Sequence, residues 1–258
     1  MTDNDDWLKT SLGNSTPDSI TVRGLDLATE VMGEMSFADF AFLLAADRMP
    51  SDGESKMFNA VLTSLADHGL TPMALASRLT YTGAPESMQG AIAAGLLGAG
   101  SVFLGPVEDT ARFLHDILEE IPEVEQRNRA TLEEAAAEGV AAALLGGRRV
   151  PGLGHPIHRE TDPRTPRLYQ LAEETGVLGP HLRLLELVAA AYEEEMDKKL
   201  PINGAGAAGA VLADLGFPPS LTRGFALLAR VAGLIGHLAE EAEHPIGMRL
   251  WKEIDERT

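Results

Sequence analysis

The residues best suited to chemistry lie in one stretch, 147–164, where four arginines and two histidines fall within 17 residues. Arginine offers a planar fork of N–H donors that fits phosphate and carboxylate groups, and an imidazole can take up or release a proton near neutral pH. The glycines of this stretch let the backbone come close to a ligand. The stretch predicts a site for a multiply anionic molecule. The alternative is a solvated surface loop whose arginines pair with the many local acids.

A second candidate is His68, which follows Asp67 at the end of a predicted helix that Gly69 caps. A histidine in such a place is either a site residue or an ordinary polar residue at a helix terminus. Both interpretations stay open on these residues alone.

A third candidate is the pair Lys198 and Lys199, which precedes a glycine-rich turn, 200–206, and then an alanine-rich helix. Positive side chains before a helix N-terminus suit anion binding, and the alternative is a plain start of a helix. Glycines with G-x-G-x-x-G spacing begin at Gly204. No hydrophobic strand precedes them, so they are a weak indication of a dinucleotide site.

The elements that must position these residues are almost all helices, because alanine and leucine abound, aromatics make up only 5 % and period-2 alternation is scarce. Ser36 and Asp39 resemble a capping box before an apolar run. The single strand-like stretch is 19–23. Apolar spacing and terminating glycines predict further helices over 131–145, 184–192 and 221–238.

The composition sets limits on function. The chain has 258 residues, 45 % of them hydrophobic and 23 % charged, which is ordinary globular composition. A net charge of −18 makes nucleic acid and anionic membranes poor partners. The absence of cysteine excludes disulfides, thiolate catalysis and cysteine-based zinc sites. The seven histidines are scattered along the chain, so no metal site is predicted.

The chain also lacks the expected marks of a membrane or secreted protein. No stretch is apolar for the roughly 20 residues that a membrane span needs. The first residues, 1–12, are acidic and polar and contain no apolar signal-peptide core. We expect a cytoplasmic protein. The expected organisation is a large helical domain made of 1–106 and 201–258, with a smaller helical lobe formed by 107–200.

These residues match a known family. The segment 151–164 resembles the signature loop of the citrate synthase superfamily, G-x-G-H-x-x-x-R-x-x-D-P-R. The segments 19–27, 200–203 and 228–237 resemble further family segments and follow in the same order. The resemblance implies an all-α fold with a large helical domain and a smaller helical lobe, an active site between them, and a homodimer or higher homo-oligomer.

The resemblance also indicates a branch of the family. In true citrate synthases the segment 100–105 would carry a P-L-H-G-G motif, and the position of its histidine falls on Phe103. Phenylalanine there resembles the citryl-CoA lyases and the lyase module of ATP-citrate lyase. The segment 66–72 resembles those enzymes too.

The family implies a role for each matched residue. His68 and His155 would be catalytic and contact the oxaloacetate-like half of the substrate. Arg164 and Arg230 would hold its carboxylates. The residues implied for binding coenzyme A, the thioester cofactor, are Arg159, Gly152, Gly154, Lys199 and Asn203.

Two positions depart from the family. Its N-V-D-G motif aligns without gaps on 203–206, so the catalytic aspartate falls on Ala205, whose methyl group moves no proton. Losing one acid/base group typically costs about 10²–10⁴ in rate. At Glu243 and His244, citrate synthases carry an arginine that reaches into the partner's site.

Three functions follow from this pattern. The first is an enzyme that cleaves a 3-hydroxy-acyl-CoA, citryl-CoA or an analogue, to acetyl-CoA and a 2-oxo acid. His155 would be the base on the hydroxyl, and backbone N–H groups at 203–206 would stabilise the enolate. Water, His68, Glu108 or Asp109 would supply the last proton. The second is a non-catalytic acyl-CoA or organic-acid binding protein, which Ala205 favours, and the third is a helical scaffold without a ligand.

Overall fold

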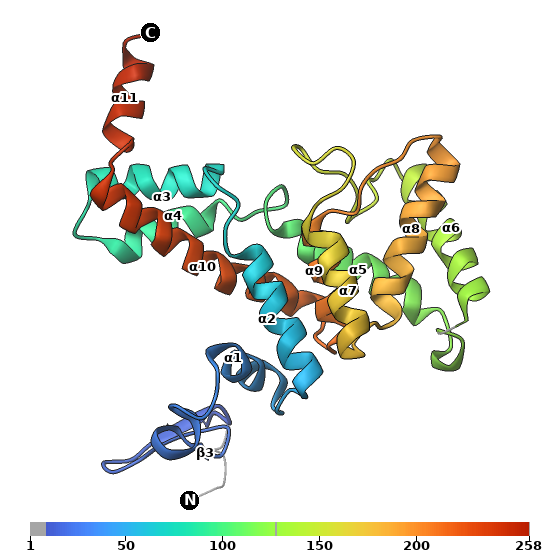
Figure 1. The fold of residues 1–258 in the computed structure, drawn as a ribbon, viewed down its shortest axis with the longest axis horizontal. Coiled ribbons are helices and arrows are strands. Elements are labelled where there is room, and N and C mark those ends of the chain that lie inside the picture. Colours follow the sequence, from blue (N-terminus) through green and yellow to red (C-terminus); the bar gives the residue numbers. More distant parts are fainter. Residues whose placement is uncertain (1–8, 127, 258) are drawn as a thin grey trace, which may run out of the picture.

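The computed structural model describes residues 9–126 and 128–257, and these are mostly helical (Figure 1). This confirms the predicted all-α class. The first eight residues, part of the predicted domain 1–106 and of the polar stretch 1–12, lie outside the described residues. The α-helices are α1 (Phe37–Ala46), α2 (Asp52–Ala66), α3 (Pro72–Gly83), α4 (Met88–Leu97), α5 (Gly105–Glu119), α6 (Arg129–Leu145), α7 (Arg164–Thr175), α8 (Pro180–Met196), α9 (Gly204–Asp214), α10 (Pro219–Glu243) and α11 (Gly247–Asp255).

A small antiparallel sheet precedes these helices. Its strands are β1 (Gly13–Ser15), β2 (Ile20–Val22) and β3 (Leu25–Asp26), in the order β1-β2-β3, with Gly13 opposite Val22. The predicted strand over 19–23 is β2, but β1 and β3 were missed because two or three residues are too few to show alternation. A turn of π-helix, η2 (Leu27–Val31), follows.

The helix termini show where local sequence signals work and where they fail. The Ser36 Oγ accepts the N–H of Asp39 at 3.0 Å and caps α1, as predicted. The predicted start at Thr131 is wrong, because α6 begins at Arg129 and Asn128 caps it by accepting the N–H of Ala130 at 3.0 Å. An asparagine side chain satisfies a free N–H as well as threonine does, so the helix extends to the earlier cap. A 3-10 turn, η3 (Glu123–Glu125), lies just before it.

The centre of the core is a group of four phenylalanines. Phe42 on α1, Phe58 on α2 and Phe225 on α10 surround Phe217, with ring centroids 4.5–5.8 Å apart, several of them edge to face. Such aromatic pairs contribute about 0.5–1.5 kcal/mol each beyond the area that they bury. The cluster therefore fixes α10 against α1 and α2.

The long helix α10 runs through the middle of the helical body and packs on α2, α3, α4 and α5 (Figure 1). The expectation that no stretch is long and apolar enough to span a membrane is wrong for this helix, which passes that test by length and composition. Its buried face, with Ala226, Leu234 and Leu238, contacts other helices. A buried core helix passes the same test, so the observation is weak evidence for a membrane span.

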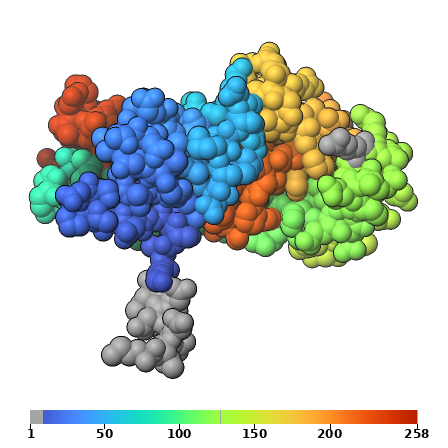
Figure 2. All heavy atoms as spheres, turned by 90° about the horizontal axis from the view of Figure 1, so that it is seen from below, coloured from blue at the N-terminus to red at the C-terminus, as the bar shows by residue number. Residues whose placement is uncertain are grey.

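The helices form two groups along α10. The first group holds α3, α4 and α11, and the second holds α5 to α9, with α2 in contact with both α10 and α7. Figure 2 shows the segment up to α1 (blue) covering one face beside α2, with α6 (green) at the opposite end from α11 (red). The predicted domain boundaries near 106 and 200 stay a prediction.

Candidate active site

Three histidines come together in the described structure. His68 lies in the connection between α2 and α3, whereas His155 and His158 lie in the long loop between α6 and α7. The ring centroids of His68 and His155 are 5.3 Å apart, and those of His155 and His158 are 4.4 Å apart and stacked at 26°. The two histidines predicted to be catalytic are therefore neighbours. His158 is a third member; the sequence placed it in the 147–164 stretch but gave it no role of its own.

The loop that carries His155 is fastened through Asp162, which is fully buried. Its carboxylate accepts the Nε–H and Nη2–H of Arg164 at 3.0 and 2.7 Å and the backbone N–H of Gly204 at 2.8 Å. Burial works to raise the pKa of Asp162, but these hydrogen bonds outweigh it and hold the pKa well below its usual range. The carboxylate stays charged and joins the loop to the start of α9.

A second connection runs through Asn203, which was predicted to bind coenzyme A. The N–H of its side-chain amide donates to the carbonyl of Gly154 at 2.8 Å, and the side-chain oxygen accepts the backbone N–H of Gly206 at 2.8 Å. Its backbone N–H donates to the carbonyl of Gly152 at 2.9 Å. The side chain thus acts as the N-cap of α9 and as an anchor of the loop.

Two of the glycines have a packing reason. Gly152 has a φ of +82°, which L-residues with side chains rarely adopt. A Cβ on Gly206 would come within 2.5 Å of the Cα of Gly152. The loop and α9 therefore meet at van der Waals contact of their backbones. The positive φ accounts for the glycine at 152 and this close contact for the glycine at 206, in both cases without a ligand.

Arg230 on α10 is a buried cation that forms no ion pair with any residue in the described ranges 9–126 and 128–257. It is 5 % exposed, and its buried Nε makes no hydrogen bond within the described residues. Burial lowers the pKa of its guanidinium, and the charge of Asp67 partly offsets this effect. An unpaired buried charge costs several kcal/mol, so the position is suited to an anionic ligand.

Arg164, the other residue predicted to bind a substrate carboxylate, already makes hydrogen bonds to groups of the protein itself. Besides Asp162, it contacts the backbone carbonyl of Ser64, which its Nη1–H reaches at 3.3 Å. Three of its five N–H donors are used in this way. Two donors are left for a ligand, so Arg164 and Arg230 differ in what they can offer.

The histidines of the cluster are held neutral by their surroundings. The pKa of His68 is lowered by burial and by the positive charges of Arg164, His158 and Arg230. The pKa of His155 is lowered by burial and by His158. Both imidazoles are therefore uncharged near pH 7.

The hydrogen bonds of His155 decide its tautomer. Its Nδ1 accepts the backbone N–H groups of Ile157 and His158 at 3.1 and 3.0 Å. A ring nitrogen that accepts carries no proton, so the proton of the neutral ring lies on Nε2. In this arrangement His155 is a hydrogen-bond donor to an oxygen of a ligand. The predicted role as a base requires the other tautomer.

One face of α10 packs on the end of α2, directly before His68. His237 follows Arg230 by about two turns, and its Nε2 lies 2.9 Å from the carboxylate of Asp67. A Cβ on Gly233, between them, would overlap the carbonyl of Ala66. The helix is thus packed directly on the end of α2. The heptad spacing of Arg230 and His237 is a signal in the sequence, but the pairing with Asp67 needs the fold.

The other predicted residues occupy different places. Arg159 and Lys199 are exposed, whereas Ala205 is half-buried in the first turn of α9 and Phe103 packs against the core. Of the four backbone N–H groups at 203–206, three donate within the chain, to Gly152, Asp162 and Asn203. The N–H of Ala205 is the one left over among the described contacts. One of the acids suggested as a proton donor, Glu108, pairs with Arg112 and Arg223.

The three imidazoles also have the arrangement of a metal-ligand set, since their ligand atoms lie within 4.8 Å of one another. From the sequence we expect scattered histidines. That expectation is wrong for these three, which belong to two separate loops but come together in the fold. Arg164 and Arg230 place positive charge beside them, which opposes a bare cation.

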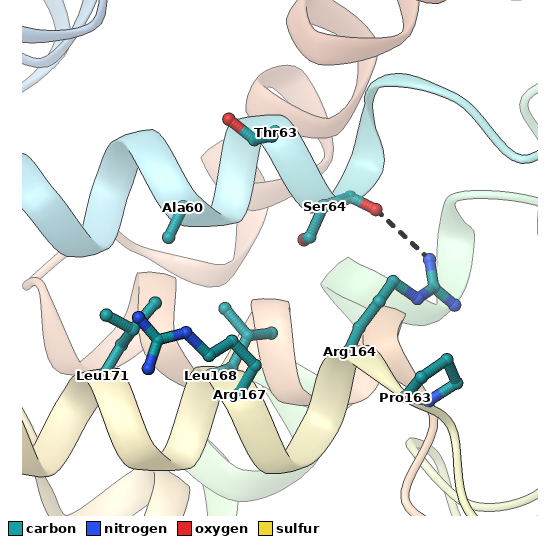
Figure 3. Close-up of a pocket in the computed structure, with 8 residues that line it drawn as sticks. All are labelled: Ala60, Thr63, Ser64, Pro163, Arg164, Arg167, Leu168 and Leu171. Atoms are coloured by element: carbon teal, nitrogen blue, oxygen red, sulfur yellow. Dashed lines mark hydrogen bonds between the residues drawn. The ribbon is translucent and has the colours of Figure 1, made fainter.

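A groove of about 410 Å³ lies between α2 and α7, with Arg164 at one end and no histidine in its lining (Figure 3). It offers Arg164 and Arg167 among otherwise neutral side chains, so the chemistry belongs at the histidines. Its remaining lining residues are Ala60, Thr63, Ser64, Pro163, Leu168 and Leu171.

The fold and site together define a helical protein with a cationic, histidine-lined site between its two helix groups. The family model of the citrate synthase C-terminal domain matches residues 23–252. The structure of citryl-CoA lyase from Hydrogenobacter thermophilus matches with 32 % identity and a TM-score of 0.81, covering 90 % of this chain and 86 % of that one. The chain therefore belongs to the citrate synthase family, as the signature loop predicts.

More distant matches agree on the fold. ATP citrate lyase from Methanosaeta concilii, in complex with (3S)-citryl-CoA, matches with 21 % identity and a TM-score of 0.73, covering 92 % of this chain and 40 % of that one. The probable ATP-citrate synthase of Dictyostelium discoideum is 24 % identical over 90 % of this chain and 38 % of its own length. Citrate synthase from Haloferax volcanii is 24 % identical over 80 % of this chain and 51 % of its own length. The chain thus spans about a third to a half of these curated relatives.

Proposed function

We propose that this protein cleaves a 3-hydroxy-acyl-CoA, citryl-CoA or an analogue, to acetyl-CoA and a 2-oxo acid. The observation that carries the proposal is the buried Arg230, which has no counter-charge among the described residues and lies near the neutral imidazole of His68, itself next to His155. A 2-oxo acid with a second carboxylate supplies the anion that this guanidinium lacks. The similarity to a citryl-CoA lyase supports the same substrate class.

The residues divide the work as follows. Arg230 and the two free donors of Arg164 bind carboxylates of the oxo-acid half. The Nε2–H of His155 donates to the hydroxyl oxygen and stabilises it as it becomes a carbonyl oxygen. The N–H of Ala205 is the backbone donor available to the thioester enolate. Arg159 and Lys199, both exposed, are placed to meet the phosphates of coenzyme A at the rim.

The test is an assay of citryl-CoA cleavage with the purified chain, followed by release of acetyl-CoA and oxaloacetate. We expect turnover with citryl-CoA or with a malyl- or methyl-substituted analogue. We also expect coenzyme A and oxaloacetate to raise the melting temperature, because a ligand that binds only the folded state stabilises it. Failure of both ligands to shift the melting temperature at millimolar concentration would leave only the helical scaffold.

The second candidate is a non-catalytic acyl-CoA or organic-acid binding protein. Ala205, aligned with the family's aspartate, favours it, because a methyl group transfers no proton. The discriminating result is tight binding of coenzyme A without turnover of any of the thioesters. In that case Ala205→Asp is expected to bring cleavage into the same site.

We further propose that the protein is a homodimer or higher homo-oligomer. The amphipathic helix α11 projects from the body (Figure 1) and leaves Met248, Trp251 and Ile254 about half exposed. Exposed apolar side chains in one row are typical of an interface. Light scattering coupled to size exclusion tests this, and Trp251→Glu is expected to shift the protein toward the monomer.

A further inference from the structure

The imidazole of His158 is the one part of the histidine cluster that the family signature leaves unassigned. In G-x-G-H-x-x-x-R, position 158 is one of the variable residues. The ring is partly exposed and lies 4.4 Å from the ring of His155 and 5.9 Å from that of His68. Among the contacts of the described residues, neither of its ring nitrogens makes a hydrogen bond. An imidazole with both ring nitrogens available therefore lies beside the residue proposed to donate to the substrate oxygen.

The two neighbouring histidines are poorly placed to accept a proton. The Nδ1 of His155 is occupied by two backbone N–H groups, one of them from His158 itself, so its Nε2 carries a proton already. His68 faces the guanidinium groups of Arg164 and Arg230, and their charge opposes its protonation. The carboxylate of Asp162, whose charge also acts on His155, is committed to Arg164 and Gly204.

We propose that His158 is the proton carrier of this site and replaces the carboxylate that the chain lacks at Ala205. The inference rests on the proposed cleavage reaction. His158 takes the hydroxyl proton as the O–H and C–C bonds break, and the hydroxyl carbon becomes the carbonyl of the 2-oxo acid. The electron pair of the C–C bond passes into the thioester enolate, and the imidazolium then gives the same proton to the α-carbon. The products are acetyl-CoA and the oxo acid, and the imidazole is neutral again.

The geometry of the substrate makes one carrier sufficient. The hydroxyl oxygen and the α-carbon are separated by two bonds, so a single ring nitrogen within hydrogen-bond reach of one, about 3 Å, needs little movement to reach the other. In the family, by contrast, a separate carboxylate serves the α-carbon. In this chain, which carries Ala205 in place of that carboxylate, the third imidazole of the loop can transfer the proton from the hydroxyl oxygen to the α-carbon.

The test compares His158→Gln with His115→Gln in the full-length chain. His115 is a partly exposed histidine on α5, as His158 is in its loop; it pairs with Glu119, outside the cluster, and serves as the matched control. We expect His158→Gln to lower kcat for citryl-CoA by about 10²–10⁴-fold, with KM and the Kd for coenzyme A within about threefold. The acid limb of the kcat–pH profile should disappear with the imidazole.

Two rescue experiments separate a proton carrier from a structural role. Added imidazole is expected to restore part of kcat to His158→Ala, because the small ring can occupy the space left. Ala205→Asp is expected to restore part of the turnover of His158→Gln, because a carboxylate that takes up the hydroxyl proton can pass it to the α-carbon two bonds away. A merely structural histidine responds to neither.

The outcomes are distinguishable. If the native chain cleaves the thioester and His158→Gln keeps kcat within about threefold, or loses only KM, the carrier role is overturned and the proposed function stands. A loss of kcat that neither imidazole nor Ala205→Asp restores also overturns it. If the native chain binds coenzyme A but turns over no thioester, the proposed function fails and the carrier role fails with it.

Discussion

Two buried arginines of this protein have opposite surroundings. Arg78 on α3 is 2 % exposed, and it donates to Glu241 at 2.6 Å and to Glu240 at 2.9 Å. Arg230 on α10 is 5 % exposed, and its Nε has no partner in the described part of the chain. Both guanidinium groups are removed from water, but only one is neutralised within the fold.

The difference lies in what each arginine joins. Glu241 also accepts the N–H groups of Ile246 and Gly247 at 3.0 and 2.8 Å, so Arg78 helps to hold α3, α10 and the start of α11 together. Arg230 lies near Arg164, whose charge adds to its own. Burial alone does not mark a site residue. A buried charge left without a counter-charge does, because the chain bears a cost that a ligand can remove.

The largest expected effect is on the paired arginine. Arg78→Met leaves Glu241, 3 % exposed, without its counter-charge, and we expect the free energy of unfolding to fall by about 3–5 kcal/mol. Urea unfolding at pH 7 measures it. Arg249→Met, at a side chain 82 % exposed on α11, is the matched control and should change stability by less than about 0.5 kcal/mol. A loss below about 1 kcal/mol for Arg78→Met would remove the contrast.

Arg230→Met is expected to act on binding and not on folding. Removing an unpaired buried charge should leave the unfolding free energy of the ligand-free protein unchanged or raised. The affinity for oxaloacetate should fall about 10²-fold, since the charge-assisted hydrogen bonds are lost. Calorimetry and urea unfolding measure the two quantities. If Arg230→Met destabilises the ligand-free chain as much as Arg78→Met does, the two arginines do not differ as described.

An exposed pair gives a smaller effect. Hydrogen bonds from Arg48 lower the pKa of Glu54 from 4.5 to about 2. Because the folded pKa is below the unfolded one, the stabilisation is present above pH 4.5 and is lost as the pH falls towards 2. The Arg48 side chain is 48 % exposed, so solvent screening limits the contribution to about 1 kcal/mol. Glu54→Gln should be less stable than the native chain at pH 5, and the gap should close near pH 2.5; a constant gap contradicts this account.

The smallest expected effect comes from the histidines next to Arg230. Burial and positive neighbours lower the pKa of His68 below 6.5 in the folded protein. The unfolded chain then binds more protons, so stability is present above pH 6.5 and falls as the pH drops through that value. His68→Gln should therefore show a weaker loss between pH 7 and pH 5 than the native chain in parallel urea titrations. Equal slopes for the two proteins would show that His68 is not held neutral by this site.

The local signals in the sequence predicted much of the fold. Ser36 caps α1, Leu145 ends α6, and the apolar rows over 184–192 and 221–238 lie within α8 and α10. Capping and helical periodicity depend on residues within a few positions of one another, so they are visible in the chain. The start of α6 and two short strands were missed, because competing caps and strands of two or three residues leave ambiguous signals.

The site was only partly visible. The signature loop led to His155 and Arg164, and the family match led to His68 and Arg230. Neither the loop motif nor the family match showed that Arg164 is held by Asp162 or that His158 stacks on His155. Asn203, predicted to bind coenzyme A, caps α9 and fastens the loop. These are matters of which donor finds which acceptor once the loop has folded.

By itself the sequence determined the helical class, the acidic surface and the family, because composition, periodicity and a long motif are written along the chain. Only the tertiary structure decided which charges are paired. Arg78 and Glu241 are 163 positions apart, and His237 and Asp67 are 170 apart. Burial and pairing depend on contacts between such distant segments, since the free energy of a charge is set by the groups that surround it in space.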